Sequence, residues 1–445
     1  MRPGSWFRPL VFAVAIVASS CTERIPSAPS DLELRLARNA GGPTVTAADP
    51  SHGQPGQTLD VRVLGSGYNA GSNVSFALTG VTTNKIVTNR TTFVSSTEVV
   101  ANITITETAD LALYDVIVIT SDGKKGIGTE KFQVGFEEAQ LPTAGGTTGD
   151  ALAINDQGVI VGSSTDRAGD RNGVTYPVRW NLVGGNWTIT KLATTASKLA
   201  AARAINESNI IVGTSNGRGI VWLPNGQTVD LGVSCPKAIN GAGTIVGTAV
   251  TPQGLQGAVW IRNATGWNPP QFLDRSLVPA SWNWGVCDLT GGVAVNGAGL
   301  IVGSSFLSEP VKWMGESSTG PWGAAVVLSA NGGAYAVNEA GDFLESIYPE
   351  FAPRVFHATG EELQLSKSGP AWPTGFSFGM NDSQVPDVVA RDSSRQLWVL
   401  LGGAASWKKL GRFGGDVRDI NNATAAQPMR IVGYMAGKPM VWTVR

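Results

Sequence analysis

The sequence predicts an all-β protein with two folded parts, a β-sandwich followed by a β-propeller. Three features of the 445 residues indicate this class: 56 glycines, 14 tryptophans and a charged content of only 15%. Apolar residues occur in short runs between glycine-rich turns, and long segments with a 3.6-residue period are missing after the N-terminus. The length suits two or three domains rather than one.

The composition also excludes several classes of function. The formal net charge is −1, so we expect no basic surface for nucleic acid or for an anionic membrane. The two histidines, His52 and His357, fall in different predicted domains, which argues against a histidine-dependent triad or metal site. The sequence has no phosphate-binding glycine loop and no calcium-loop spacing of acids. We therefore expect no cofactor and no metal.

The first 21 residues have the pattern of a targeting signal. Arg2 and Arg8 flank an apolar run at residues 10–18, which is too short to span a membrane. Three small residues then lead into Cys21. This arrangement resembles the bacterial lipoprotein signal, which implies that Cys21 becomes the lipidated N-terminus; plain secretion is the alternative. Residues 22–41 are polar and form a predicted linker.

Residues 42–135 are predicted to form the sandwich. Alternating apolar residues mark strands around residues 59–63, 99–105 and 116–118, with turn signals between them. Strands at such short intervals are typical of a β-sandwich. The segments GSGYNAGSNVSF, VSSTEVVANITI and YDVIVITSDG resemble a bacterial Ig-like domain of the IPT/TIG type. That resemblance implies a spacer or a binding module on a surface protein.

A repeated unit occupies residues 136–445. It begins with Ala, an aliphatic residue and Asn, and in most copies Ile-Val-Gly follows. A run ending in an aromatic residue and a run ending in Leu come next, so each unit has four predicted strands. Seven copies give about 44 residues each, the size of a propeller blade. Their anchoring asparagines are Asn155, Asn206, Asn240, Asn296, Asn338, Asn381 and Asn421.

The order of the runs predicts how the ring closes. Only six copies are followed by a run ending in Leu, and the seventh such run precedes the first copy and ends at Leu141. We therefore expect a seven-bladed β-propeller of four-stranded blades, its last blade completed by the strand around residues 136–141. Closure of the ring removes exposed sheet edges. A β-solenoid is the alternative.

The repeated residues have structural roles in this interpretation. We expect each Asn to cap the first turn of its blade and to tolerate a positive φ there, and each aromatic residue to pack between blades. The Ala-Ile-Asn and Ile-Val-Gly segments resemble the HAF family of bacterial extracellular repeats. The resemblance implies an exported β-propeller and supplies no catalytic residues.

Candidate ligand-binding residues lie in the long loops that share one face of the predicted ring. Exposed aromatic rings beside polar side chains are suited to holding a sugar ring or a peptide. The alternative is that these rings fold back over the blade edges. The candidates are Asp166, Arg167, Trp282, Asn283, Trp284 and Trp372.

Two further sets of residues lie near the start of innermost strands. Asp150, Asp288 and Asp416 precede such strands in three copies, which makes them weak candidates for the paired acids of a glycan-cleaving enzyme; acids that only satisfy turns are the alternative. Cys235 and Cys287 are predicted in loops that enter adjacent blades. In an oxidising envelope they can form a disulfide, and two buried thiols are the alternative.

The function expected from these features is that of a non-catalytic lipoprotein on the bacterial cell surface or in the periplasm, binding a glycan or a protein. Its only membrane contact is then the lipid anchor. The alternative is a secreted carbohydrate-active enzyme, a glycosidase or lyase that uses acids near the ring axis.

Overall fold

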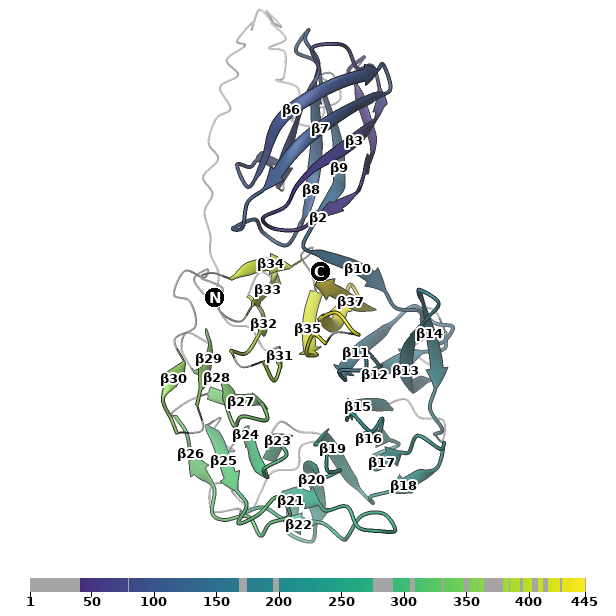
Figure 1. Ribbon diagram of the computed structural model, residues 1–445. Helices are drawn as coiled ribbons and strands as arrows, with labels where there is room; N and C mark the ends of the chain where they lie inside the picture. Colours follow the sequence, from purple (N-terminus) through teal and green to yellow (C-terminus); the bar gives the residue numbers. More distant parts are fainter. Residues whose placement is uncertain are drawn as a thin grey trace, which may run out of the picture.

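The computed structural model describes residues 41–444, apart from 79, 168–173, 195–199, 275–290, 305–308, 330–331, 348–351, 358, 364–378, 384, 393–394, 402–406, 411–414 and 425. The described residues form an all-β structure of two parts, a sandwich of two sheets and a ring of four-stranded sheets (Figure 1). No helix in the described ranges is long and apolar enough to cross a membrane.

The sandwich packs a four-stranded sheet against a five-stranded one. The first has the order β1 (Thr44–Asp49), β3 (Thr58–Ser66), β7 (Glu98–Ile105) and β6 (Ile86–Ser95). The second has the order β2 (His52–Gly53), β9 (Lys125–Val134), β8 (Leu113–Ile119), β4 (Asn73–Leu78) and β5 (Val81–Thr82). Alternate residues of β3 and β7 are fully buried, as their apolar pattern predicts. They share one core with Phe76 and Phe132, whose rings meet edge to face at 5.3 Å.

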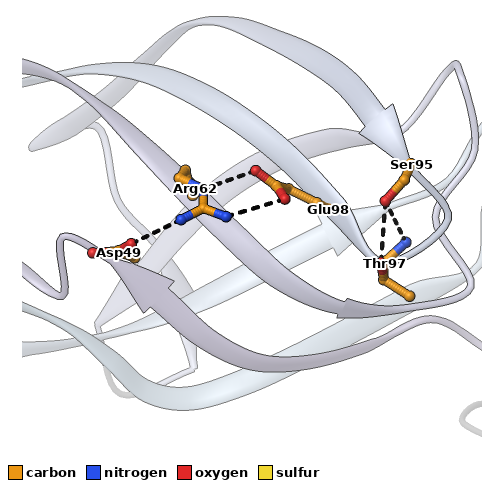
Figure 2. A network of polar contacts seen from close by, with 5 residues as sticks. All are labelled: Asp49, Arg62, Ser95, Thr97 and Glu98. Carbon is orange, nitrogen blue, oxygen red and sulfur yellow. Dashed lines mark hydrogen bonds and ion pairs between the residues drawn. The ribbon is translucent and has the colours of Figure 1, made fainter.

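The exposed face of the first sheet carries an ion network across three strands (Figure 2). The guanidinium of Arg62 on β3 donates to Glu98 on β7 at 2.8 and 3.2 Å and to Asp49 on β1 at 3.1 Å. Half of the Arg62 side chain is exposed, at 51%. Because solvent screens exposed ion pairs, the network adds little stability, and we assign it no further role.

The described ranges of residues 136–444 contain seven four-stranded sheets. The first sheet contains β11 (Gly149–Ile154), β12 (Ile160–Thr165), β13 (Thr175–Val183) and β14 (Asn186–Lys191). The second contains β15 (Ala201–Ile205), β16 (Ile211–Ser215), β17 (Arg218–Trp222) and β18 (Thr228–Asp230). The third contains β19 (Ser234–Ile239), β20 (Ile245–Thr251), β21 (Gly254–Trp260) and β22 (Gln271–Phe272). The fourth contains β23 (Gly291–Val295), β24 (Leu300–Ser304), β25 (Pro310–Met314) and β26 (Val326–Val327). The fifth contains β27 (Gly332–Val337), β28 (Phe343–Ile347), β29 (Ala352–Phe356) and β30 (Glu362–Leu363). The sixth contains β31 (Gly379–Met380), β32 (Val388–Arg391), β33 (Leu397–Leu400) and β34 (Lys408–Leu410).

The remaining sheet, here called the closing sheet, combines both ends of the ring segment. It contains β35 (Gly415–Ile420), β36 (Arg430–Met435), β37 (Lys438–Val444) and β10 (Phe136–Gln140). β10 pairs with β37 in an antiparallel ladder from Phe136 opposite Val444 to Gln140 opposite Met440. This is the pairing that the displaced Leu141 run predicts. The sheets are separate and antiparallel, and each is built mainly from consecutive strands. A β-solenoid would stack its repeats instead, so the ring is not a β-solenoid.

The aromatic residue of each third strand lies between neighbouring sheets, as expected. Trp180 of the first sheet is fully buried and shares a core cluster with Val432 and Val441 of the closing sheet. Its Nε1 donates to the carbonyl oxygen of Pro142 at 2.7 Å. Trp222 is buried in the same way between the first and second sheets. These contacts make the ring a continuous series of cores.

The sandwich also shares a core with the ring. Leu111, which lies between β7 and β8, is 1% exposed and belongs to a cluster with Leu410 of the sixth sheet and Phe136 of the closing sheet. Leu111 and Leu410 also form a parallel β-bridge. Gly135 alone separates β9 from β10, and a Cβ placed on it would lie 2.2 Å from Leu111 Cδ2. The strand that closes the ring is therefore fixed directly to the sandwich.

The repeated asparagines join neighbouring sheets as well as capping turns. The Oδ1 atoms of Asn155, Asn206, Asn240 and Asn296 each accept from the backbone N–H four residues later, which is the expected cap. Their Nδ2 atoms donate to the carbonyl oxygen of the equivalent Asn in the next sheet, at 2.9–3.1 Å. We call these contacts the asparagine belt.

One detail of the turn prediction is wrong. The anchoring Asn residues do not adopt a positive φ; the left-handed residue lies three positions later, at Gly158, Asn209, Gly243, Gly299 and Gly341. The physical reason is that each Asn is the first residue of its turn, where its carbonyl oxygen accepts from the backbone N–H three residues later. The left-handed conformation falls at that later residue, which is Gly in four of these copies and Asn209 in the second.

Candidate functional site

The innermost strands surround the axis of the ring (Figure 1). Each contacts the innermost strands of its neighbours, and β11 contacts β35 across the point of closure. Most of them contain a β-bulge at the same place, two residues before the Ile or Val of the repeat. Bulges commonly reorient a side chain near functional sites. The residues at this bulge are Leu152, Arg203, Lys237, Val293, Tyr335 and Arg418.

Arg418 connects two of the acids singled out in the sequence. Its Nη2 lies 3.0 Å and its Nε 3.2 Å from Asp150 Oδ2 in the first sheet. Its Nη1 lies 3.3 Å from Asp416 Oδ2 on its own strand. The face of the Tyr434 ring lies 5.2 Å from the Arg418 guanidinium carbon, a cation–π distance. One guanidinium therefore engages both carboxylates at the joint between the closing sheet and the first sheet.

Two more arginines extend this group. Arg391 of the sixth sheet approaches Asp416 with its Nε at 3.5 Å from Oδ1. Arg203 of the second sheet interacts electrostatically with Asp150 and Arg418, and its Nε is buried with no hydrogen-bond partner in the described part of the chain. We refer to Asp150, Arg203, Arg391, Asp416 and Arg418 as the axial network.

Burial controls the ionisation of these groups. It raises the pKa of Asp150 and of Asp416, and the field of Arg418 offsets part of that rise. Burial lowers the pKa of Arg203. The network is nevertheless reachable from solvent, since the side chains of Arg418 and Asp150 keep 30% and 24% of their surface exposed.

A second polar layer lies at the turns after the innermost strands. Carboxylates of residues that directly follow the repeated Asn accept hydrogen bonds from backbone N–H groups of neighbouring turns at 2.7–2.8 Å. These acids are Asp156, Glu207, Glu339 and Asp382. Burial raises the pKa of Glu207, and the charges of Asp156 and Asp382 add to that rise. The layer ties the turns together, and no metal-binding group of three or more His, Cys, Asp or Glu residues occurs in the described ranges.

The structure brings together two of the three candidate acids. Asp150 and Asp416 lie inside β11 and β35 rather than before them, because both strands start one residue earlier, at a glycine. Asp288 lies outside the described residues. Pairing through a shared arginine is a feature that the acids alone do not indicate.

The other candidates lie mostly outside the described ranges. Asp166 accepts a hydrogen bond from the Val174 backbone N–H at 3.0 Å, which holds the base of its loop, and Arg167 is exposed. Trp282, Asn283, Trp284, Trp372 and Cys21 are among the residues not described, so their roles stay predictions.

Cys235 lies within β19, not in the loop predicted for it. It is buried and takes part in a disulfide bond. Because Cys287 lies outside the described residues, the pairing of these two cysteines stays a prediction.

Sequence reasoning missed the three arginines of the axial network. Two of them could have been found from the repeat. In the innermost strand of each copy, the residue two positions before the Ile or Val varies from copy to copy, while its neighbours are repeated. In copies two and seven that residue is Arg203 and Arg418. Arg391 had no such signal, since it ends the second strand of a copy that lacks Ile-Val-Gly.

No family model and no curated protein matches the chain. One solved structure similar to the chain is described as YCF48 bound to D1 peptide, with 14% sequence identity and a TM-score of 0.42. The match covers 69% of this chain and 96% of that chain. A similarity of this size assigns no function.

Proposed function

We propose that the protein is a non-catalytic lipoprotein of the bacterial cell envelope that binds a glycan or a protein. Cys21 carries the lipid, residues 22–41 form a linker, and an IPT/TIG-like sandwich at residues 42–135 holds a seven-bladed propeller of HAF-like repeats at residues 136–445. The shared core around Leu111 supports this arrangement, because it packs the sandwich directly against the ring.

The observation that carries the non-catalytic proposal is the engagement of both axial acids by Arg418. A glycosidase acid needs a free carboxyl to protonate the leaving group, and its partner must reach the sugar or a water molecule. The Asp150 carboxylate is instead held by two nitrogens of Arg418, and Asp416 lies against both Arg418 and Arg391. Such a network is suited to holding a ligand rather than to cleaving one.

One observation favours the alternative, a secreted carbohydrate-active enzyme. The raised pKa of Asp150 and of Asp416 is a property of general acids. We therefore test both functions in one experiment, in which the purified protein is applied to a glycan array and then incubated with each bound glycan.

Binding without new products supports the binding protein. Product formation that is lost in Asp150→Asn and Asp416→Asn supports the enzyme. The anchor is tested separately, because Cys21→Ser should release the protein from the membrane fraction. Retention of that variant in the membrane would contradict the lipoprotein assignment.

A further inference from the structure

We propose that the axial network binds the carboxylate of a sugar acid, a uronate residue of an acidic polysaccharide, and that Arg203 receives it. The inference rests on the proposed binding function and names the ligand class of the ring. Three features of the network support it: the state of Arg203, the balance of charges, and the acceptors beside Arg203.

Arg203 has the donors for an anion and does not use them all. A guanidinium carries five N–H donors and no acceptor. The Nε of Arg203 is buried with no hydrogen-bond partner in the described ranges, and the nearby carboxylate of Asp150 is hydrogen-bonded to Arg418. Leaving a buried charged donor unsatisfied is costly, whereas a bound carboxylate matches the planar fork of the guanidinium.

The charges of the axial network also favour a bound anion. The guanidinium groups of Arg391 and Arg418 pair with the carboxylates of Asp150 and Asp416. Arg203 interacts electrostatically with Asp150, and Arg395 with Asp416. The cations outnumber the carboxylates, and a bound anion offsets the excess positive charge. Lys237 occupies the equivalent bulge in the third sheet, so the next innermost strand also carries a cation at this level.

The remaining groups favour a sugar acid over a peptide C-terminus. Asp150 is a partly exposed hydrogen-bond acceptor near Arg203. A carboxylate held by an arginine still has lone pairs that can accept from the hydroxyl groups of a sugar ring. A peptide terminus offers few donors beside its carboxylate. Access is available, because Arg203 is itself partly exposed and the side chains of Asp150 and Arg418 keep 24% and 30% of their surface exposed.

The proposal is tested by titrating the full-length protein with short oligogalacturonates in a calorimeter. The matching neutral galactose oligomers and a short peptide with a free C-terminus serve as comparison ligands. The main variant is Arg203→Leu, which should fold because Leu152 occupies the same bulge in the first sheet. Arg218→Gln is the control, since Arg218 pairs with Asp230 at the exposed rim of the second sheet.

We expect oligogalacturonates to bind the wild type and Arg218→Gln equally, and to bind Arg203→Leu at least about 10-fold more weakly, in line with the loss of a charge-assisted hydrogen bond. Neutral oligomers should not bind at this site. Equal uronate affinity of wild type and Arg203→Leu overturns the proposal, as does peptide binding that depends on Arg203 without uronate binding.

The outcome is separable from that of the proposed function. If other glycans or a protein bind while oligogalacturonates do not, the binding function stands and the axial site is wrong. If Arg203→Leu loses uronate binding but keeps the thermal midpoint of the wild type, the effect lies in recognition and not in folding.

Discussion

The Asp419 carboxylate bridges the two ends of the ring, because its Oδ2 accepts a hydrogen bond at 2.9 Å from the backbone N–H of Ile154. Its Oδ1 accepts from the Ile420 N–H at the same distance. The equivalent residue in the other six copies is Ala or Gly. Asp419 is thus a polar staple that only the joint between the closing sheet and the first sheet contains. Burial raises the pKa of Asp419 to about 7.

This raised pKa predicts a stability that depends on pH. The folded state keeps a proton on Asp419 that the unfolded chain releases above about pH 4. The folded state therefore binds more protons than the unfolded state between about pH 4 and 7, and the free energy of unfolding falls as pH rises through that range. In Asp419→Asn the free energy of unfolding should fall less steeply as pH rises. The decrease in slope should correspond to at most about one bound proton, as measured by urea unfolding between about pH 5 and 8.

The control for this experiment is Asp122→Asn. The hydroxyl of Thr120 and the ammonium of Lys124 lower the pKa of Asp122, so its titration lies below the tested range and the slope should not change. An Asp419→Asn slope identical to that of the wild type would show that Asp419 does not titrate in this range.

The asparagine belt predicts a large loss of stability from one buried side chain. Asn240 accepts from the Thr244 N–H at 2.8 Å and donates to the Asn296 carbonyl oxygen at 2.9 Å, and it is only 4% exposed. Asn240→Ala leaves both backbone groups without these partners, and each such group costs about 1–3 kcal/mol. Chemical denaturation should show this decrease in the free energy of unfolding.

Asn225→Ala is the matched control. Asn225 is exposed, and its hydrogen bonds are to Gln227 within its own turn. Its loss should change the free energy of unfolding by less than about 0.5 kcal/mol. Similar losses in the two variants would mean that the belt adds nothing beyond an ordinary turn.

These contacts show how far the sequence determines the fold. The period of the repeat predicts four strands in each unit, and the displaced Leu141 run predicts the pairing of β10 with β37. Both follow from local pattern and copy number. The cap made by each Asn is equally local, since its partner lies four residues away.

The bond from Asn155 to Asn206, by contrast, joins residues 51 apart, and its geometry exists only once the sheets stand side by side. The same limit applies to the candidate site. Asp150 was recognisable from its place in the repeat, but the Arg418 that holds it is 268 residues away. A residue pair of this kind follows from ring closure and not from spacing. The bulge that presents Arg203 and Arg418 is also not encoded by a turn signal, because it falls inside a strand.

The shared core predicts that a substitution in the first domain weakens the ring. Leu111→Ala removes buried methyl groups from a cluster that includes Leu410 and Phe136, and such truncations cost about 2–5 kcal/mol. Hydrogen–deuterium exchange should become faster in β34, β10 and β37. Leu182→Ala, at a position 43% exposed on the first sheet, is the control. Faster exchange confined to the sandwich would show that the two parts are not coupled through Leu111.

The turn after the innermost strand supplies a test within one hairpin. Gly243 has a φ of +88°, and a Cβ placed on it would lie 2.7 Å from Arg262 Cδ. Gly241, two residues earlier, has nothing within 4 Å of such a Cβ and no positive φ. Gly243→Ala should lower the free energy of unfolding by about 1–2 kcal/mol, because an L-residue is strained in the left-handed region, while Gly241→Ala should change it little.

Gly243→Asn should fall between these two variants. Asn209 occupies the same turn position in the second sheet with a φ of 57°, and Asn tolerates this conformation better than Ala because its side chain can hydrogen-bond locally. Denaturation midpoints of the three variants would give the order directly. If Gly241→Ala were as damaging as Gly243→Ala, the cause would be the loss of glycine in general and not the left-handed conformation, and the explanation of the repeated Asn-x-x-Gly spacing would fail.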